Sequence, residues 1–231
     1  MKHALFWSGG KDSLLALDRA TRAGLEVSHL INISEGNTGR VRFHGVRKEL
    51  IQAQADALGK SLLQFETLTP SPTLPQGGGG LSFEQVFAHA LEEARALGVE
   101  AIAFGNIHLT DVRAWYEERT TAAGFRHVEP IWGEPPGALV REFVARGHRS
   151  KIVSVYLDAG GKPEWLGRDI TTDFIEAVES AGADAAGECG EYHSFAYGGP
   201  LFRDELRIRA DERFERERHL ILDLAITPEI A

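Results

Sequence analysis

The sequence predicts an α/β fold in which a three-layer domain with a parallel sheet precedes a second, smaller α+β domain. In the first half of the chain, short apolar runs alternate with amphipathic helical patterns, and this alternation is typical of a parallel sheet that carries helices on both faces. From Trp132 onward the regular alternation is lost. We therefore expect one domain over residues 1–130 and a smaller one over residues 131–231.

The spacing of apolar residues places the elements of the first domain. It predicts buried strands at residues 4–7, 27–33, 61–65 and 100–104, separated by helices at 13–23, 46–58 and 82–97. A further helix is expected after Gly105. The segment from Pro70 to Gly80 contains three prolines and four consecutive glycines, which a regular element accommodates only at a large cost in entropy. It predicts a loop, either a plain surface connection or a cover for a ligand.

The second domain is expected to combine two helices with several strands. Helices are predicted at 137–145 and 172–181, and strands at 152–157, 183–186, 206–208 and 220–226. A turn at residues 160–163 follows the first of these strands. The run from Arg207 to Arg218 mixes acidic and basic residues, which indicates the solvated face of a strand or a helix.

Composition limits the classes to which the chain can belong. With 43% hydrophobic and 26% charged residues, it has the composition of an ordinary globular protein. Its net charge of -9 argues against a nucleic-acid partner, because neutralising phosphates needs clustered Lys and Arg. The single cysteine, Cys189, has no partner for an internal disulfide. Neither a secretory signal nor an apolar run long enough for a membrane is present, so we expect a cytoplasmic protein without a membrane partner.

The segment Ser8-Gly9-Gly10-Lys11-Asp12-Ser13 lies between an expected strand and an expected helix. Glycines at such a turn let backbone N–H groups approach an anion closely, and the start of a helix adds a partial positive charge. The segment therefore predicts a phosphate site, and the alternative is a plain turn in which Asp12 or Ser13 caps the helix. A Walker A loop and a dinucleotide fingerprint are excluded, because their glycine spacing is absent.

A second motif, from Gly187 to Phe195, places Glu188 and Glu191 three residues apart with a glycine between them. Carboxylates in such a loop can hold a hydrated Mg²⁺ together with substrate phosphates. They can equally bind a substrate ammonium group or act as a general base. The alternative is a solvated acidic turn.

The first motif resembles the PP-loop of the ATP pyrophosphatases, whose Ser-Gly-Gly-x-Asp-Ser signature binds the pyrophosphate part of ATP. Together with Gly-Glu-x-Gly-Glu at 187–191, it makes the chain similar to the diphthine-ammonia ligase family from about residue 2 to 209. Further matching segments are Phe43-His44-Gly45, Gly105-Asn106-Ile107, Pro130-Ile131-Trp132-Gly133 and Trp165-Leu166-Gly167-Arg168. The resemblance implies a HUP-like (adenine nucleotide alpha hydrolase-like) first domain. Two positions depart from the family pattern, because Cys189 stands where glycine is common and Asn106 where aspartate is common.

The resemblance also implies roles for individual residues. Catalytic roles fall to Lys11, Asp12, Glu188 and Glu191, and Asp12 is also the expected Mg²⁺ ligand. The residues expected to bind ATP are Ser8, Gly9, Gly10, Lys11, Asp12, Ser13, Asn32, Ile33, Ser34, Gly105 and Asn106. The residues expected to recognise the other substrate are His44, Trp165, Arg168 and His193.

The activity implied by the resemblance is that of an ATP-dependent amide ligase with ATP and Mg²⁺ as cofactors. Such an enzyme adenylates a carboxylate, releases pyrophosphate and then joins the acyl group to ammonia or an amine. The acceptor is the diphthine of elongation factor 2 if the chain is archaeal or eukaryotic, and an unknown small carboxylate in a bacterial relative. An ATP-binding sensor without turnover and a tRNA-modifying enzyme stay open, although the missing cysteine pair argues against the latter. A homodimer is an expected alternative to a single chain.

Overall fold

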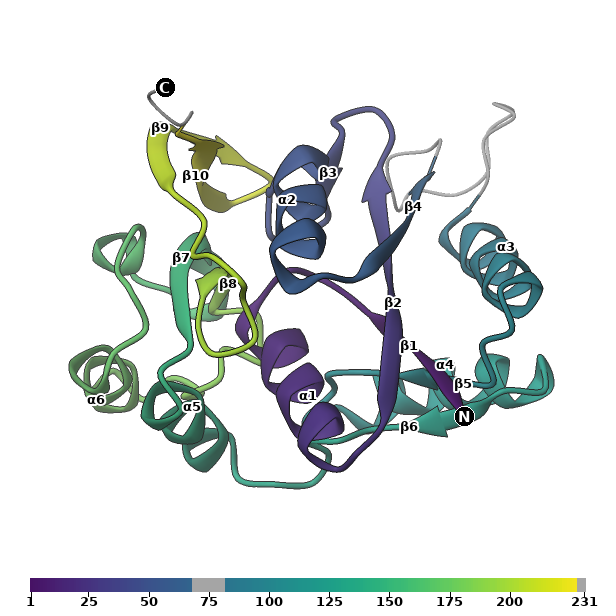
Figure 1. The fold of residues 1–231 in the computed structure, drawn as a ribbon. Helices are drawn as coiled ribbons and strands as arrows, with labels where there is room; N and C mark the ends of the chain where they lie inside the picture. Colours follow the sequence, from purple (N-terminus) through teal and green to yellow (C-terminus); the bar gives the residue numbers. More distant parts are fainter. Residues whose placement is uncertain (68–81, 228–231) are drawn as a thin grey trace.

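The computed structural model describes residues 1–67 and 82–227, which form two sheets with six α-helices (Figure 1). Sheet A consists of β1 (Lys2–Phe6), β2 (Glu26–Glu35), β3 (Arg40–Val41), β4 (Ser61–Thr67), β5 (Ala101–Ala103) and β6 (Arg126–Val128). Its helices are α1 (Lys11–Arg22), α2 (Lys48–Leu58), α3 (Phe83–Ala96) and α4 (Thr110–Ala122). Sheet B consists of β7 (Arg149–Tyr156), β8 (Tyr192–Gly198), β9 (Ile208–Arg216) and β10 (His219–Ile226), and its helices are α5 (Pro136–Ala145) and α6 (Thr172–Ser180).

The parallel strands of sheet A follow the spatial order β4-β2-β1-β5-β6, and β3 pairs antiparallel with the end of β2. From β1 the chain steps outward to β2 and then β4, and it returns past β1 to form β5 and β6. The strand order therefore reverses at β1. In open α/β sheets, ligands bind beyond the carboxyl ends of the strands at such a reversal.

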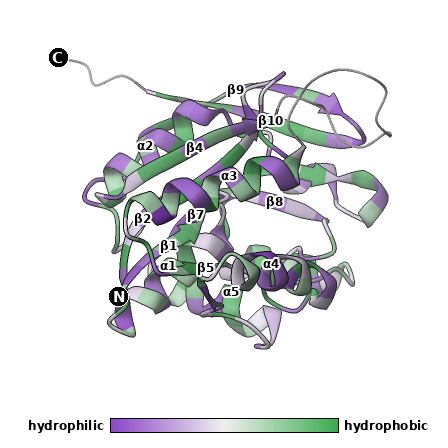
Figure 2. Cartoon of the chain, turned by 90° about the vertical axis from the view of Figure 1, so that its right-hand side faces the viewer, coloured by the Kyte–Doolittle hydropathy of each residue, from purple (hydrophilic) through white to green (hydrophobic). Residues whose placement is uncertain are grey.

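Helices cover both faces of sheet A, with α1 and α2 on one face and α3 and α4 on the other (Figure 1). Because side chains alternate along a strand, Leu5 of β1 belongs to the buried cluster on the α1 face, whereas Ala4 belongs to the cluster that contains Phe87 of α3. Hydrophobic and hydrophilic residues both occur along α3 in Figure 2, as an amphipathic helix requires. The predicted parallel sheet with helices on both faces is confirmed.

Sheet B is antiparallel, with the order β8-β7-β10-β9, and it forms the smaller α+β lobe together with α5 and α6. The two lobes share a core, since Leu14 of α1 and Phe195 of β8 belong to one buried cluster. The backbone N–H of Ala196 in β8 also donates to the Gly9 carbonyl, at 2.8 Å. The domain boundary near residue 130 stays a prediction.

One expected strand is wrong, and three strands were not predicted: β3, β6 and β8. Residues 183–186 form turns, because the Ala186 N–H donates to Asp184 Oδ1 (2.7 Å) and such local bonds compete with a strand ladder; alanine also has a low strand propensity. Residues 192–195, the end of the second motif, were expected in a loop but begin β8, a mostly buried edge strand of sheet B. The strand expected at 206–208 begins only at Ile208 and continues through the mixed-charge run as the mostly exposed β9.

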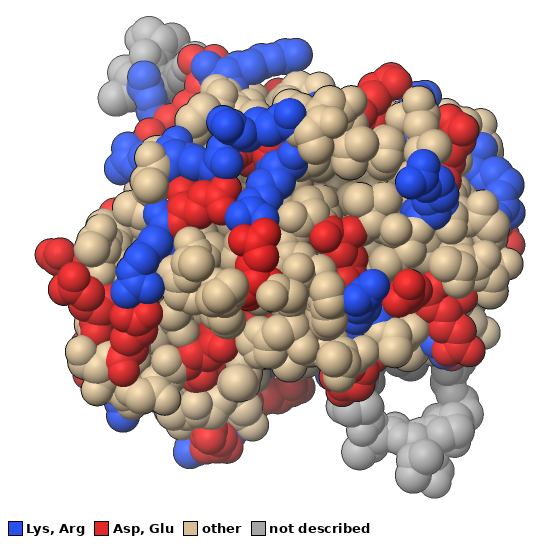
Figure 3. Space-filling view, turned by 90° about the horizontal axis from the view of Figure 1, so that it is seen from below, with Lys and Arg blue, Asp and Glu red and all other residues tan. Residues whose placement is uncertain are grey.

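The surface carries both signs of charge. Acidic and basic side chains are interspersed over the face shown in Figure 3. Among the described helices, none combines the length and the apolar character needed to cross a lipid bilayer. The loop expected from Pro70 to Gly80 lies within residues 68–81, outside the described residues.

Candidate functional site

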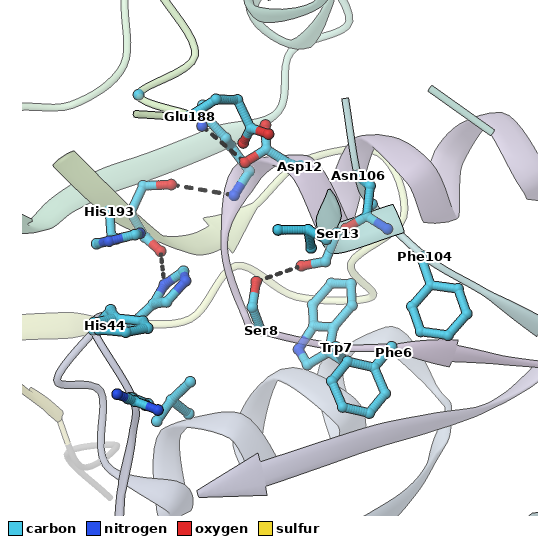
Figure 4. Close-up of a pocket in the computed structure, with 18 of the residues that line it drawn as sticks. Phe6, Trp7, Ser8, Asp12, Ser13, His44, Phe104, Asn106, Glu188 and His193 are labelled. Atoms are coloured by element: carbon cyan, nitrogen blue, oxygen red, sulfur yellow. Dashed lines mark hydrogen bonds and ion pairs between the residues drawn. The ribbon is translucent and has the colours of Figure 1, made fainter. Parts of the chain in front are cut away.

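A cavity of about 470 Å³ opens at the carboxyl edge of sheet A, where the strand order reverses. Its walls come from the ends of β1, β2 and β5, the start of α1, the β3–α2 loop and the segment that leads into β8. Figure 4 shows Phe6 and Phe104 at one end and His44 and His193 at the other. The expected site residues that line it are Ser8, Lys11, Asp12, Ser13, Asn32, Ile33, His44, Gly105, Asn106, Glu188 and His193.

Helix α1 begins at the cavity wall without a capping side chain. Its N-cap is Gly10, and Asp12 and Ser13 lie inside the helix, so the turn is not the plain capped turn considered as the alternative. By contrast, α3 has a complete capping box of Ser82 and Gln85. The first N–H groups of a helix have no intrahelical partners. The Lys11 N–H donates to Ser194 Oγ (3.1 Å) and the Gly10 N–H to Ser8 Oγ (3.2 Å), so an anion at the start of α1 would gain the N–H groups that follow Lys11 and the helix dipole.

Two glycines make close backbone approaches at this turn. Gly9 has φ +84°, and a Cβ at this position would lie 2.6 Å from Ile51 Cδ1 and 2.8 Å from Gln54 Oε1. Gly105 lets the end of β5 approach α1, because a Cβ there would lie 3.0 Å from the Asp12 carbonyl carbon. Both positions therefore require glycine to keep the strand ends and the helix start together.

Gln54 of α2 holds the turn from inside the protein. It is fully buried, and its Nε2 donates to the carbonyls of Gly9 (2.9 Å) and Ala196 (2.5 Å), while Trp7 Nε1 donates to its Oε1 (2.8 Å). Sequence reasoning missed this residue. A glutamine on the apolar face of the predicted helix 46–58 was the signal that could have found it, since buried amides need partners.

The polar end of the cavity holds an ammonium group between carboxyl groups. Lys11 is 4% exposed, and its Nζ donates to Asp12 Oδ2 (2.8 Å) and to the Ala186 carbonyl. Burial by itself would lower the pKa of Lys11, but Asp12, Tyr192 and Glu188 raise it above its ordinary value. Burial and the nearby Asp12 carboxylate raise the pKa of Glu188 to about 8. Glu188 can therefore exchange a proton close to neutral pH.

Two uncharged imidazoles continue the polar end. His44 Nδ1 lies 3.1 Å from the Ser194 carbonyl oxygen, which can only accept a hydrogen bond, so Nδ1 carries the proton. Burial lowers the pKa of His44 to about 4. Burial, together with the nearby His44 and Lys11, lowers the pKa of His193 well below its ordinary value. The two ring centroids are 4.7 Å apart, so two neutral rings face each other beside the Lys11 ammonium group.

The apolar end was not predicted. Its side chains come from the ends of β1 and β5, the start of α3 and the first half of α4, and they are Phe6, Phe83, Phe104, Leu109, Val112 and Tyr116. Phe6 and Phe104 are the residues at which two predicted strands reach the carboxyl edge, and Leu109, Val112 and Tyr116 have helical spacing. Either pattern could have indicated a wall for an apolar group such as a nucleotide base.

Six expected residues do not line the cavity: Gly9, Gly10, Ser34, Glu191, Trp165 and Arg168. Ser34 Oγ donates to the Phe65 carbonyl at the edge of the sheet (3.3 Å). Glu191 is buried, and its Oε1 accepts a hydrogen bond from the Asp184 N–H (2.9 Å), which fixes the loop that carries Glu188. Trp165 and Arg168 pack against α6. Gly9 and Gly10 shape the turn without lining the cavity themselves.

The two positions that depart from the family pattern have different surroundings. Cys189 is exposed and free, and the glycines on either side of its short segment, Gly187 and Gly190, have positive φ angles. Asn106 lines the cavity, and its Nδ2 donates to Glu129 Oε1 (2.8 Å). An aspartate at this position would place two carboxylates in contact, so the amide suits the site better.

The donor set fits a magnesium ion that arrives with a phosphate ligand. Among the described residues, no group of three or more His, Cys, Asp or Glu side chains is arranged to hold a metal. The Asp12 side chain is 25% exposed at the cavity and shares its carboxylate with Lys11. Proteins usually bind Mg²⁺ through one or two carboxylates, with phosphates and waters as the other ligands, and Asp12 meets that requirement.

The chain matches two family models in succession. The diphthamide synthase N-terminal domain matches residues 1–127, and the diphthamide synthase C-terminal domain matches residues 135–227. Among curated proteins, a diphthine-ammonia ligase from Danio rerio is 23% identical over 220 residues, which cover 89% of this chain and 85% of the relative.

Similarity to solved structures is weaker. A glycinamide ribonucleotide transformylase from Symbiobacterium toebii has a TM-score of 0.27 and 18% identity, with 46% of this chain and 40% of the other chain covered. The U34-tRNA thiolase NcsA from Methanococcus maripaludis has a TM-score of 0.37 and 16% identity, with 63% and 55% covered. These values carry no argument about function.

The two family models cover both lobes in order and confirm the resemblance seen in the sequence: the chain belongs to the diphthamide synthase family.

Proposed function

We propose that the protein is an ATP-dependent amide ligase, which activates a carboxylate with ATP and joins it to ammonia or an amine. One observation carries the proposal: the uncapped start of α1, with Lys11, shares a cavity with Glu188 from the loop before β8. The name of the Danio rerio relative, diphthine-ammonia ligase, supports a carboxylate acceptor and an ammonia donor. We propose the diphthine carboxylate, or a small carboxylate of similar chemistry, as the acceptor.

In the first half-reaction, the phosphates of ATP lie at the start of α1. Ser8 Oγ, Ser13 Oγ and the Lys11 ammonium group face this position, and the apolar end of the cavity receives the base. A carboxylate oxygen attacks the α-phosphorus, the bond from this phosphorus to the bridging oxygen breaks, and pyrophosphate leaves. Fixed donors aimed at the phosphates supply electrostatic stabilisation where charge develops. Asp12 would hold a Mg²⁺ ion, which would neutralise charge on the phosphates.

In the second half-reaction, the nitrogen of ammonia attacks the activated acyl carbon and AMP leaves. The attacking nitrogen must lose a proton, and Glu188 lies at the cavity wall to accept it. The pKa of Glu188, raised to about 8, suits proton exchange near neutral pH, because a general base works best when its pKa is close to the operating pH.

Product analysis tests the proposal directly. ATP, Mg²⁺, ammonium and a panel of carboxylic acids should yield AMP and pyrophosphate with at least one acid, whereas ADP and phosphate as products would exclude the reaction.

The Lys11→Met variant should lose about 10²–10³-fold in rate, as expected when a charged donor to a reacting group is removed. Lys162→Met, which alters an exposed lysine outside the cavity, is the matched control and should keep its rate. Tight ATP binding without acid-stimulated pyrophosphate release would instead favour the sensor function.

A further inference from the structure

A tight turn from Asp184 to Gly187 lies between α6 and β8 and reaches the first lobe. The Gly187 N–H donates to the Asp184 carbonyl (2.9 Å) and closes the turn. Gly187 has φ +69°, and a Cβ at this position would lie 2.8 Å from the Tyr192 carbonyl oxygen, so the turn requires glycine here. The two residues inside the turn, Ala185 and Ala186, are buried. The conformation of the turn is therefore closely constrained.

The side chain of Asp184 fixes the peptide group in the middle of this turn. Its Oδ1 accepts a hydrogen bond from the Ala186 N–H (2.7 Å), and the Asp184 N–H donates to Glu191 Oε1 (2.9 Å). Tyr192 contributes separately, because its hydroxyl group donates to the Ala185 carbonyl (2.6 Å). Asp184 is thus held by the buried Glu191 and in turn sets the orientation of Ala186.

The Ala186 carbonyl is the group through which the turn contacts the phosphate site. It accepts a hydrogen bond from Lys11 Nζ, and Asp12 Oδ2 accepts a second one at 2.8 Å. An ammonium group has three N–H donors, and no third acceptor for Lys11 Nζ is found among residues 1–67 and 82–227. Two fixed acceptors therefore determine where the remaining N–H group points, and it is available to a ligand in the cavity.

The negative charge of Asp184 does not by itself favour an anion. Burial and Asp12 raise the pKa of Glu188, and Asp184 adds to that rise, so its carboxylate lies within electrostatic range of the cavity. A carboxylate at such a range repels a phosphate group. A gain in phosphate affinity from Asp184 must therefore come from its hydrogen bond to Ala186 and not from its charge.

We propose that Asp184 is a positioning residue for Lys11. It orients the Ala186 carbonyl, and this carbonyl directs the Lys11 ammonium group toward a phosphate ligand at the start of α1. The second lobe thereby controls a phosphate donor of the first lobe. The identification of the ligand as ATP rests on the proposed function, whereas the coupling between Asp184 and Lys11 rests on the contacts alone.

Equilibrium binding of a non-hydrolysable ATP analogue tests this role without turnover, with adenosine as the ligand that lacks phosphates. Asp184→Ala should weaken binding of the analogue by roughly 2- to 12-fold, the contribution of one hydrogen bond, and leave adenosine binding unchanged. Asp184→Asn should restore the affinity, because its amide oxygen can still accept the Ala186 N–H. Asp204→Ala, which alters an exposed aspartate, is the control.

A double-mutant cycle shows whether Asp184 acts through Lys11. In a Lys11→Met background, Asp184→Ala should cause no further loss of affinity for the analogue. Additive losses, or an equal loss in Asp184→Asn and Asp184→Ala, would overturn the positioning role. If Asp184→Ala does not fold in urea titrations, Asp184→Glu takes its place in the cycle, because it keeps the charge but displaces the accepting oxygen.

The outcomes also separate this proposal from the ligase function. Coupling between Asp184 and Lys11 while no acid stimulates pyrophosphate release would keep the positioning role and exclude the ligase. Acid-stimulated pyrophosphate release together with additive losses would keep the ligase and exclude the positioning role.

Discussion

The carboxyl group of Glu188 lies among like charges, and this arrangement makes its ionisation depend on pH in the neutral range. Its pKa is raised from 4.5 to about 8 by burial and by Asp12. If the ionised form accepts the proton of the attacking nitrogen, the amidation rate should rise with pH through an apparent pKa near 8. Glu188→Gln should abolish this limb and lower the rate by about 10²–10⁴-fold. A pH–rate profile of the second half-reaction checks this, and an unchanged limb in the variant would remove Glu188 from the base role.

The same shift predicts how the stability of the fold depends on pH. Because the pKa of Glu188 is higher in the folded than in the unfolded chain, its contribution to stability is complete below pH 4.5 and is lost as the pH rises through about 8. In urea titrations, the free energy of unfolding of Glu188→Gln should therefore fall less than that of the wild type between pH 4.5 and about 8. Glu164→Gln changes an exposed glutamate and should reproduce the wild-type dependence.

Among the elements, α2 supports the turn from Ser8 to Ser13 through the buried side chain of Gln54. Gln54→Leu keeps the volume but leaves Trp7 Nε1 without its acceptor and removes the Nε2 donor from the carbonyls of Gly9 and Ala196. The Gly9 carbonyl keeps the Ala196 N–H as a partner. Each unsatisfied buried group costs about 1–3 kcal/mol, so denaturant unfolding should show a clear loss of stability. ATP affinity should fall as well, because Gly9 loses one of the two hydrogen bonds that hold its carbonyl.

The same helix offers a matched control for Gln54. Gln52 is exposed, and its Nε2 donates only to the neighbouring Asp56 carboxylate, at 2.8 Å. An exposed pair of this kind contributes about 0.2–0.5 kcal/mol. Gln52→Leu should therefore unfold and bind ATP almost as the wild type does. Equal effects of the two substitutions would show that α2 stabilises the turn through general packing and not through Gln54.

At the scale of the whole molecule, the sequence predicts four of the five parallel strands, because β1, β2, β4 and β5 are short apolar runs between helical patterns. β6 was not predicted, because two of its three residues are Arg126 and His127. The sequence also places the turn from Ser8 to Ser13 at the carboxyl edge, since the strand order of such sheets sets that edge. β8 was not predicted, because two glycines and two glutamates precede it and are typical of a loop. The contact of Phe43 with His193 and His219 was equally inaccessible, because these residues become neighbours only through the pairing of distant strands.

The two lobes are also joined by an ion cluster at the β3–α2 loop. Asp223 of β10 has a side chain that is 1% exposed, and it accepts hydrogen bonds from Arg40 Nη1 (2.8 Å) and Arg47 Nε (3.0 Å), which flank the β3–α2 loop. Arg40 Nη1 also donates to the Gly45 carbonyl inside that loop (2.6 Å). Burial would raise the pKa of Asp223, but the two guanidinium groups lower it to about 2. Asp223 is therefore a positioning residue for the loop that carries Phe43 and His44.

Asp223→Asn should consequently affect the acceptor more than ATP. Breaking a fully buried ion pair costs about 3–5 kcal/mol, and the loss here should be smaller because the Arg47 side chain is 43% exposed. The lowered pKa of Asp223 stabilises the fold above pH 3.8, and this contribution is lost as the pH falls through about 2. The loss of stability in Asp223→Asn, relative to the wild type, should therefore be complete at neutral pH. KM for the acid should rise while ATP affinity changes little. Asp204→Asn, at an exposed aspartate between β8 and β9, is the control, and an equal rise in KM in both variants would contradict the positioning role.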